Sequence, residues 1–405
     1  MVKILSGESR QANRFTVVFF IVLGMLLPIS LPLVHDTDGF GTALFAESVP
    51  SAEITFNTAF LADSNGLSLY PGGATGGITL KLNSARADAI KGNIQLSADS
   101  DANLALDRAY LKARFPWFVQ DTSFRLTGGK APLSWGKGFV FNAGDPVFGA
   151  LPSTSLTGTD SSDYRTAADW MTVATLPVGG FSFAELVYLP PVDAVAKENA
   201  GDETAEVHNR AGGRLFVTPG LGLLQSIEAG YLFAEGPVNT IYIALDGSLF
   251  FDYYASACSY VSSVNAKWQA DYATSFGIFR MIDVPNVPLS IRAEGLIYPE
   301  YNRQLWYQSV QAGISDSLQL TVYGLFATGI DDTADLVTIQ AFSTPYNSKP
   351  SALALLPGSA GVAAVSLSWT PLKGCTFSGA VLKQFSGDDS MGEGVILSAG
   401  CKYAF

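Results

Sequence analysis

The sequence predicts an all-β fold, a transmembrane antiparallel up-and-down β-barrel of about 16–18 strands, with about 14 as a lower alternative. Three observations lead to this prediction. Charged residues make up only 15% of the 405 residues, whereas soluble domains typically contain about 25%. Only residues 15–34 form a long apolar run, although a helical membrane protein of this size needs several runs of about 20 apolar residues. Segments of about ten residues with alternating polar and apolar side chains follow, as in barrel strands.

The first 46 residues are typical of an export signal. Basic residues precede an apolar stretch that runs from Thr16 to Val34, and small residues follow it. We therefore expect a signal peptide over 1–46, cleaved after Ala43 or Ala46, and one barrel domain over 47–405. The alternative is an uncleaved anchor helix, because the apolar stretch is longer than an ordinary signal core.

Period-two alternation is clearest in two segments. In residues 89–97, polar side chains occupy every second position. In residues 288–298, Ser290, Arg292 and Glu294 alternate with apolar residues. A helix, with its period of about 3.6 residues, would not separate polar from apolar residues in this way. We therefore expect strands with one face to the lumen and the other to lipid.

Short turn signals rich in Pro, Gly and Ser separate many of these segments, and the clearest are Pro177–Gly180, Pro219–Gly222, Ser315–Ser317 and Pro371–Gly374. Longer polar stretches, such as Val192–Val207 and Gly329–Gly358, lie between other segments. Short turns at one rim and long loops at the other are typical of transmembrane barrels, with the long loops outside the cell. The region Thr240–Ser263 allows two interpretations, because Asp246-Gly247 is either a hairpin turn or a break in one long strand.

The last strand is the strongest single signal. From Val395 the alternation continues to the terminal residue, and one face carries Val395, Leu397, Ala399, Cys401, Tyr403 and Phe405. This strand resembles the C-terminal strand of bacterial outer-membrane barrel proteins, which ends in Phe with Tyr or another apolar residue two positions earlier. The resemblance implies that Tyr403 and Phe405 form the signal for the barrel insertion machinery, and that the protein lies in the outer membrane of a diderm bacterium. An ordinary C-terminal edge strand is the alternative.

A second resemblance covers Leu106–Pro146. A strand with Tyr110 is followed by Gly129-Lys130, then by Trp135-Gly136 and by Asp145-Pro146. This order is similar to a pattern in several porin-like barrel families, where a Tyr-bearing strand pairs with a Gly-Lys strand and a Trp-Gly loop follows. The resemblance implies a porin-like barrel without singling out one family. The alternative is that Trp135 and Gly136 only shape a loop.

Alternation also predicts which charged residues face the lumen. A Lys or Arg near the middle of the lipid face costs about 2–4 kcal/mol, so cations are expected on the inner face. We predict that the pore is lined by Lys81, Lys91, Arg108, Lys112, Arg114, Arg125, Glu228, Arg292 and Glu294. The residues from Lys81 to Arg125 fall on four consecutive expected strands, so they should form a basic patch on one wall.

The longest early loop runs from Leu133 to Thr166. We expect it to fold partly into the barrel as a constriction loop, with the site residues Trp135, Asp145, Asp160 and Asp163. Acidic groups set against the basic wall would produce a transverse field that orders polar solutes and favours small ions. The alternative is that the basic residues pair with internal carboxylates and stabilise a closed lumen.

These features predict a porin-like channel for passive diffusion of small polar solutes or ions. A transporter of long-chain fatty acids and a surface-exposed structural or adhesive barrel are the alternatives. We expect no enzyme activity and no catalytic residue, because no nucleophile motif accompanies the two histidines, His35 and His208.

Composition limits the partners. A formal net charge of −12 disfavours nucleic acid, whose phosphates require Lys and Arg. The expected partners are outer-membrane lipid, the insertion machinery and, in a homo-oligomer, further copies of the chain. We expect no cofactor and no metal site, since Cys258, Cys375 and Cys401 lack metal-ligand spacing. Cys375 and Cys401 lie near the same end of neighbouring expected strands, so they form either a disulfide or two free thiols facing lipid.

Overall fold

The computed structural model describes residues 48–63, 66–84, 90–99, 104–116, 123–151, 167–179, 181–191, 209–235, 238–264, 267–285, 287–299, 303–328, 359–386 and 395–405. The expected signal peptide, residues 1–46, lies outside these ranges and stays a prediction. No helix within these ranges is both long enough and apolar enough to cross a membrane.

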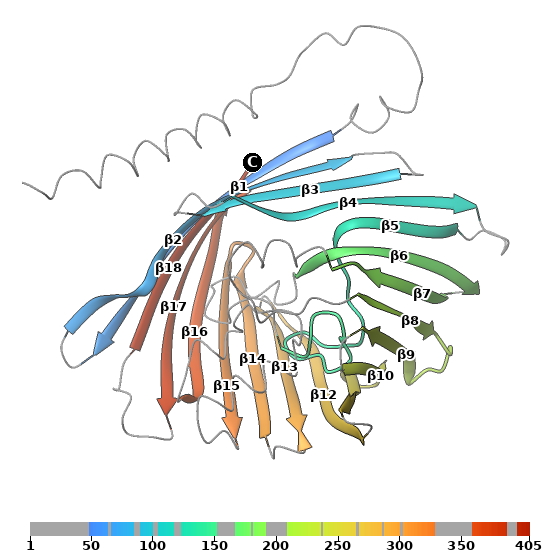
Figure 1. Cartoon of the computed structure of the whole chain (residues 1–405). Coiled ribbons are helices and arrows are strands. Elements are labelled where there is room, and N and C mark those ends of the chain that lie inside the picture. The colour runs from blue at the N-terminus through green and yellow to red at the C-terminus, as the bar shows by residue number, and fades with distance from the viewer. Residues whose placement is uncertain are drawn as a thin grey trace, which may run out of the picture.

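The described residues form 18 antiparallel strands in a single sheet that curves around a common interior (Figure 1). In chain order the strands are β1 (Ser48–Asp63), β2 (Gly66–Ser84), β3 (Ile90–Asp99), β4 (Leu104–Pro116), β5 (Ser123–Pro132), β6 (Ala168–Gly179), β7 (Ser182–Leu189), β8 (Arg210–Val217), β9 (Leu224–Ala234), β10 (Val238–Ser248), β11 (Asp252–Val264), β12 (Lys267–Val284), β13 (Val287–Tyr298), β14 (Arg303–Ser315), β15 (Leu318–Thr328), β16 (Ser359–Leu372), β17 (Cys375–Ser386) and β18 (Val395–Ala404).

The sheet closes because β1 pairs with both β2 and β18. At the seam, the backbone N–H of Ala52 donates to the carbonyl of Phe405, and the N–H of Phe405 donates to the carbonyl of Ala52, each at 2.9 Å. The strand expected from Val395 onward is β18, and Tyr403 and Phe405 at its end are 47% and 53% exposed. The closed antiparallel barrel confirms the predicted fold class, and its 18 strands stand at the top of the expected range.

Alternation separates the two faces of the wall. In β10, Ile241 and Ile243 are 53% and 52% exposed, whereas Tyr242 and Ala244 are 2% and 1% exposed. Large aliphatic side chains therefore point away from the interior. Because each strand pairs on both sides, the sheet has no free edge whose backbone groups would be unsatisfied in lipid.

The expected short turns are confirmed where the structure describes them: they connect β6 to β7, β8 to β9, β14 to β15 and β16 to β17. The β10–β11 turn differs from both alternatives that the sequence suggested. Gly247 pairs with Tyr253 and Ser248 with Asp252, so Asp246-Gly247 belongs to β10 and the turn lies at Leu249–Phe251. The long stretches Val192–Val207 and Gly329–Gly358 lie outside the described residues.

Candidate functional site

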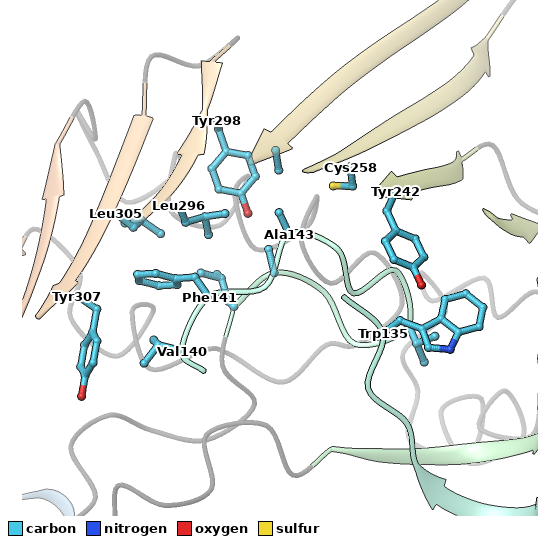
Figure 2. Close-up of a cluster of buried hydrophobic side chains, with 14 of the residues drawn as sticks. Trp135, Val140, Phe141, Ala143, Tyr242, Cys258, Leu296, Tyr298, Leu305 and Tyr307 are labelled. Carbon is cyan, nitrogen blue, oxygen red and sulfur yellow. The ribbon is translucent and has the colours of Figure 1, made fainter. Parts of the chain in front are cut away.

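The loop that follows β5 turns into the barrel. We call its described part, residues 133–151, the inner loop; in Figure 1 it lies on the concave side of the sheet. Trp135 and Phe141 are fully buried, and Figure 2 shows Phe141 lying near Leu296 and Leu305 of the wall. Trp135 stacks on Tyr242, with ring centroids 5.8 Å apart. The inner loop therefore has a hydrophobic core in common with the barrel wall.

Two glycines allow the tight path of the inner loop. Gly136 has a φ of +70°, and a Cβ there would lie 2.5 Å from Oδ1 of Asn142. A Cβ on Gly138 would lie 1.8 Å from the carbonyl oxygen of Phe141. Asn142 closes the path, since its Nδ2 donates to the carbonyl of Trp135 at 2.7 Å. A side chain at either glycine would clash with these atoms, and the loop would have to change its path.

Three wall carboxylates hold the inner loop. Glu185 on β7 accepts a 2.7 Å hydrogen bond from Nε1 of Trp135. Glu228 on β9 accepts the backbone N–H of Gly136 at 2.8 Å. Oε2 of Glu294 on β13 accepts the backbone N–H groups of residues 140 and 141, at 2.8 and 3.0 Å. Hydrogen bonds to ionised acceptors are roughly twice as strong as neutral ones, so these contacts fix the loop firmly.

Wall hydroxyls complete the attachment between those carboxylates. Ser256 on β11 accepts the backbone N–H of Lys137 and donates to its carbonyl, both at 3.0 Å. Ser275 on β12 accepts the N–H of Ala143 at 2.8 Å. Alternate inward positions on β7, β9, β11, β12 and β13 thus meet successive residues of the inner loop.

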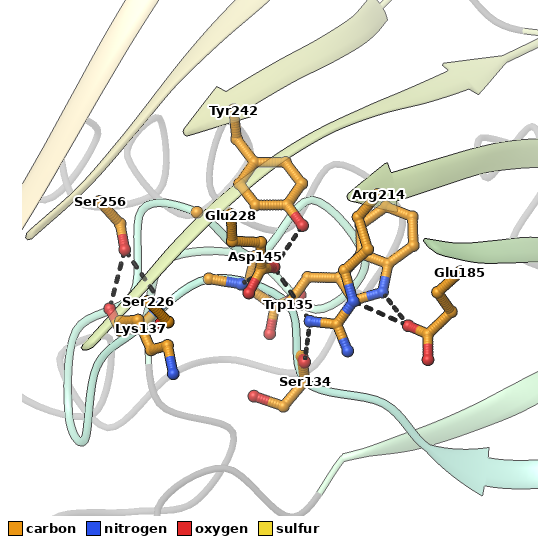
Figure 3. Close-up of polar contacts among 12 residues, drawn as sticks. Ser134, Trp135, Lys137, Asp145, Glu185, Arg214, Ser226, Glu228, Tyr242 and Ser256 are labelled. Atoms are coloured by element: carbon orange, nitrogen blue, oxygen red, sulfur yellow. Dashed lines mark hydrogen bonds and ion pairs between the residues drawn. The ribbon is translucent and has the colours of Figure 1, made fainter. Parts of the chain in front are cut away.

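Arg214 on β8 lies between two of the carboxylates (Figure 3). Its Nε is 2.9 Å from Oε1 of Glu185, and its Nη1 is 2.9 Å from Oε1 of Glu228. Nη1 also donates to the carbonyl of Ser134 at 3.0 Å. Tyr242 on β10 donates a hydrogen bond to the same Glu228 carboxylate. A buried carboxylate needs such partners, because its charge is otherwise very costly away from water.

Arg292 on β13 plays a similar part farther along the wall. Its Nη1 lies 3.4 Å from Oε1 of Glu294. Its guanidinium carbon is 3.8 Å from the ring centroid of Phe139 in the inner loop and 4.6 Å from that of Phe279 in β12. The cation therefore covers aromatic faces of both loop and wall.

The neighbouring part of the inner face, on β2 to β5, is basic. Strand register places Lys91 beside Lys112 and Arg114 beside Arg125, with Arg108 beside Gln95. These pairs, with Lys81 on β2, belong to four consecutive strands, as the sequence predicted. A cavity of about 250 Å³ lies against this wall, and its lining includes Lys91, Lys112, Arg114, Arg125, Thr175 and Glu185.

The other residues that the sequence predicted for the site lie on the wall beside the inner loop, within that loop, or outside the described residues. Glu228, Arg292 and Glu294 contact the inner loop. Trp135 and Asp145 belong to that loop, and Oδ1 of Asp145 accepts the backbone N–H groups of residues 147 and 148 at 3.1 Å each. Asp160 and Asp163 lie outside the described residues. That these residues line a pore and its constriction stays a prediction.

Several residues that shape the interior were absent from the predicted set. They are Glu185, Arg214, Tyr242, Ser256 and Ser275, all of which contact the inner loop or its carboxylate partners. Strand alternation could have assigned each to the inner face. The loop itself carried a further signal, since residues 139–141 and 147–148 are apolar, which is unusual for a loop in water.

Comparisons with known proteins give structural matches alone. No family model matches the chain, and no curated protein matches it. OccK11 (OpdR) of Pseudomonas aeruginosa has a TM-score of 0.53 and 10% identity over 90% of this chain and 97% of that one. OccD3 (OpdP) of the same organism has a TM-score of 0.50 and 12% identity over 93% and 96%. The chain has the fold of outer-membrane porins.

A third similar structure broadens the comparison. Wzi of Escherichia coli, an outer-membrane protein involved in group 1 capsule assembly and a carbohydrate-binding β-barrel, has a TM-score of 0.53 and 11% identity over 87% of this chain and 84% of that one. Identities of 10 to 12% establish a common fold and leave the function to the residues of this chain.

Proposed function

We propose that the protein is an outer-membrane channel for passive diffusion of small polar solutes, with a preference for anions. The observation that supports this most is the unequal use of charge on the inner face. Three carboxylates are bound to the inner loop, whereas four cations line the neighbouring cavity together with one of those carboxylates, Glu185. The solute path would therefore carry a positive potential.

The inner loop gives the path its shape. It is buried against one side of the interior, and its attachment spans wall residues from β7 to β13. Among the described residues, the cavity borders the basic wall, and Glu185 lies among the cations that line it. A carboxylate and cations at one constriction would produce the transverse field expected from the sequence and would align polar solutes as they pass.

Single-channel recording in a planar bilayer under a KCl gradient tests the proposal. The protein should give steady ohmic steps, with a reversal potential on the chloride-selective side. Neutralising the wall with Lys91→Gln, Lys112→Gln and Arg125→Gln should move the reversal potential toward zero. Lys112→Gln alone should move it less, and Lys373→Gln, in the β16–β17 turn, should leave it unchanged.

The possible outcomes separate the alternatives. Ohmic steps with a reversal potential that the three substitutions leave unchanged would show a channel whose solute path does not pass the basic wall. Silence with copurified long-chain lipid would favour a fatty-acid transporter. Silence without any bound ligand would favour a structural or adhesive barrel and would overturn the channel proposal.

A further inference from the structure

Three neighbouring turns at the same end of the barrel, β6–β7, β8–β9 and β10–β11, present large apolar side chains to the outside. Phe181 is 85% exposed and Phe250 is 74% exposed. Val178, Leu221, Leu223 and Leu249 are also exposed. We call these six residues the apolar rim. Isolated exposed apolar residues are ordinary, but a contiguous group of this size marks an interaction surface.

Hydrogen bonds join the three turns into one surface. The backbone N–H of Thr218, after β8, donates to Oγ of Ser182 at the start of β7 at 3.1 Å. The carbonyl of Leu223 accepts the N–H of Ser248 at 3.2 Å and the hydroxyl of Tyr253 at 2.8 Å. Hydrogen bonds therefore hold the three turns of the apolar rim against one another.

The sequence of the apolar rim has no charge. Residues 176–184, 215–227 and 247–251 contain no Asp, Glu, Lys or Arg. The charges nearest to the apolar rim, Asp246 and Asp252, lie within β10 and at the start of β11, whereas two of the next three turns on this side of the barrel themselves contain a charge, Asp316 and Lys373. Protein-binding patches on soluble surfaces usually have a polar rim around an apolar centre. Here the apolar surface continues into the outer wall through Leu186 and Leu215, which are 55% and 47% exposed.

Strand length gives a reason for apolar turns at this place. Strands β7 and β8 have 8 residues each, whereas a barrel strand needs about 9–11 residues to span a bilayer. The other strands that adjoin these three turns, β6, β9, β10 and β11, have 12, 11, 11 and 13 residues, so the deficit is confined to β7 and β8. Phe181 and Leu221 extend the apolar surface past the ends of the two short strands, and so add to the apolar height where the strands alone fall short.

We propose that the apolar rim is immersed in the lipid of the inner leaflet, where its side chains contact acyl chains. At the β6–β7 and β8–β9 turns these side chains also make up the hydrophobic thickness that β7 and β8 lack. This inference rests on the proposed membrane location but not on conduction. The barrel would then need less tilt, and the bilayer less thinning, on this side. A mismatch between the apolar height of the barrel and the thickness of the bilayer costs fractions of a kcal/mol per Å.

Spin labels test the immersion directly. Cys375→Ala and Cys401→Ala remove the outward thiols, and buried Cys258 is kept. Labels at Phe181→Cys and Phe250→Cys, in phosphatidylcholine vesicles, should collide with oxygen several-fold more often, relative to a water-soluble nickel chelate, than a control label at Asp316→Cys. A rim that the nickel chelate reaches as readily as it reaches the control would overturn the proposal in favour of a soluble partner. Spin coupling between rim labels of different molecules would overturn it in favour of a second copy.

A measurement without labels tests the same idea. The melting temperature is measured in lipids of increasing acyl-chain length, for the unaltered chain and for the double variant Phe181→Ser with Phe250→Ser. The unaltered chain should reach its highest melting temperature at a longer acyl chain than the double variant does. An unchanged optimum would contradict immersion. Conductance recorded on the same preparations keeps the two proposals apart. A silent barrel with lipid-exposed rim labels overturns the channel alone, and a conducting barrel with water-exposed labels overturns the rim alone.

Discussion

The backbone N–H of Gly136 donates a 2.8 Å hydrogen bond to Oε1 of Glu228, which lies 92 residues later in the chain. The same oxygen pairs with Arg214 and accepts the hydroxyl of Tyr242. Glu228 is 2% exposed, so its charge is satisfied by the loop and the wall and not by water. The inward carboxylates of this wall therefore position the inner loop.

Replacing Arg214 should destabilise the interior strongly. Arg214→Met keeps much of the volume but leaves Glu185 and Glu228 without their shared cation. Breaking a buried pair by removing one partner typically costs about 3–5 kcal/mol. The midpoint of guanidinium unfolding in detergent should fall accordingly, whereas Arg214→Lys should lose less. A change in unfolding free energy no larger than that of Lys373→Met, at an exposed turn, would contradict the bridging role.

Replacing Glu294 should loosen the inner loop. In Glu294→Ala, the backbone N–H groups of Val140 and Phe141 lose their shared acceptor. Each buried donor left unpaired costs about 1–3 kcal/mol. We expect noisier current and a higher mean conductance in single-channel recordings, since the loop would leave the wall more often. Ser290→Ala on the same strand, whose hydroxyl contacts Gln311 and not the loop, is the control and should record like the unaltered chain.

The closed barrel and its strand faces follow from the sequence because alternation is a local property. Each strand needs only its own side-chain pattern to assign an inner and an outer face. Lys91 and Lys112 were therefore expected on one wall, and their register places them side by side. The Asp246-Gly247 pair shows the limit, since local turn preference there was overruled by pairing of Gly247 with Tyr253.

The attachment of the inner loop could not be derived in the same way. Alternation states that Glu294 points inward, but not what it meets. Its partner, Val140, is 154 residues away, and no strand pairing connects the two. Only the assembled barrel brings them together. The apolar residues within the inner loop are a sequence signal that it would be buried, but they do not specify the wall residues that receive it.

Gly138 should be intolerant of any side chain. In Gly138→Ala the new methyl group would meet the carbonyl oxygen of Phe141, 1.8 Å from the ideal Cβ position. The loop would have to shift, at a cost of roughly 1–3 kcal/mol for an overpacked site. Unfolding midpoint and protease sensitivity of the inner loop should both change. Gly222→Ala, where a Cβ has nothing within 4 Å, provides a matched control. Equal effects of the two substitutions would show that the loop adapts freely.

The three cysteines should differ in reactivity. Cys375 pairs with Tyr403, and Cys401 pairs with Phe377, so the two thiols lie diagonally on neighbouring strands and not opposite each other. Diagonal neighbours are about 7–8 Å apart, beyond the usual reach of a disulfide, and both thiols are free.

Intact mass after treatment of the folded protein in detergent with N-ethylmaleimide, without reductant, should show two additions. Cys258, buried at 4% exposure beneath the inner loop, should react only after unfolding, or faster in Glu294→Ala if the loop leaves the wall. Two additions only after reduction would mean that Cys375 and Cys401 are bonded and that the register between β17 and β18 differs.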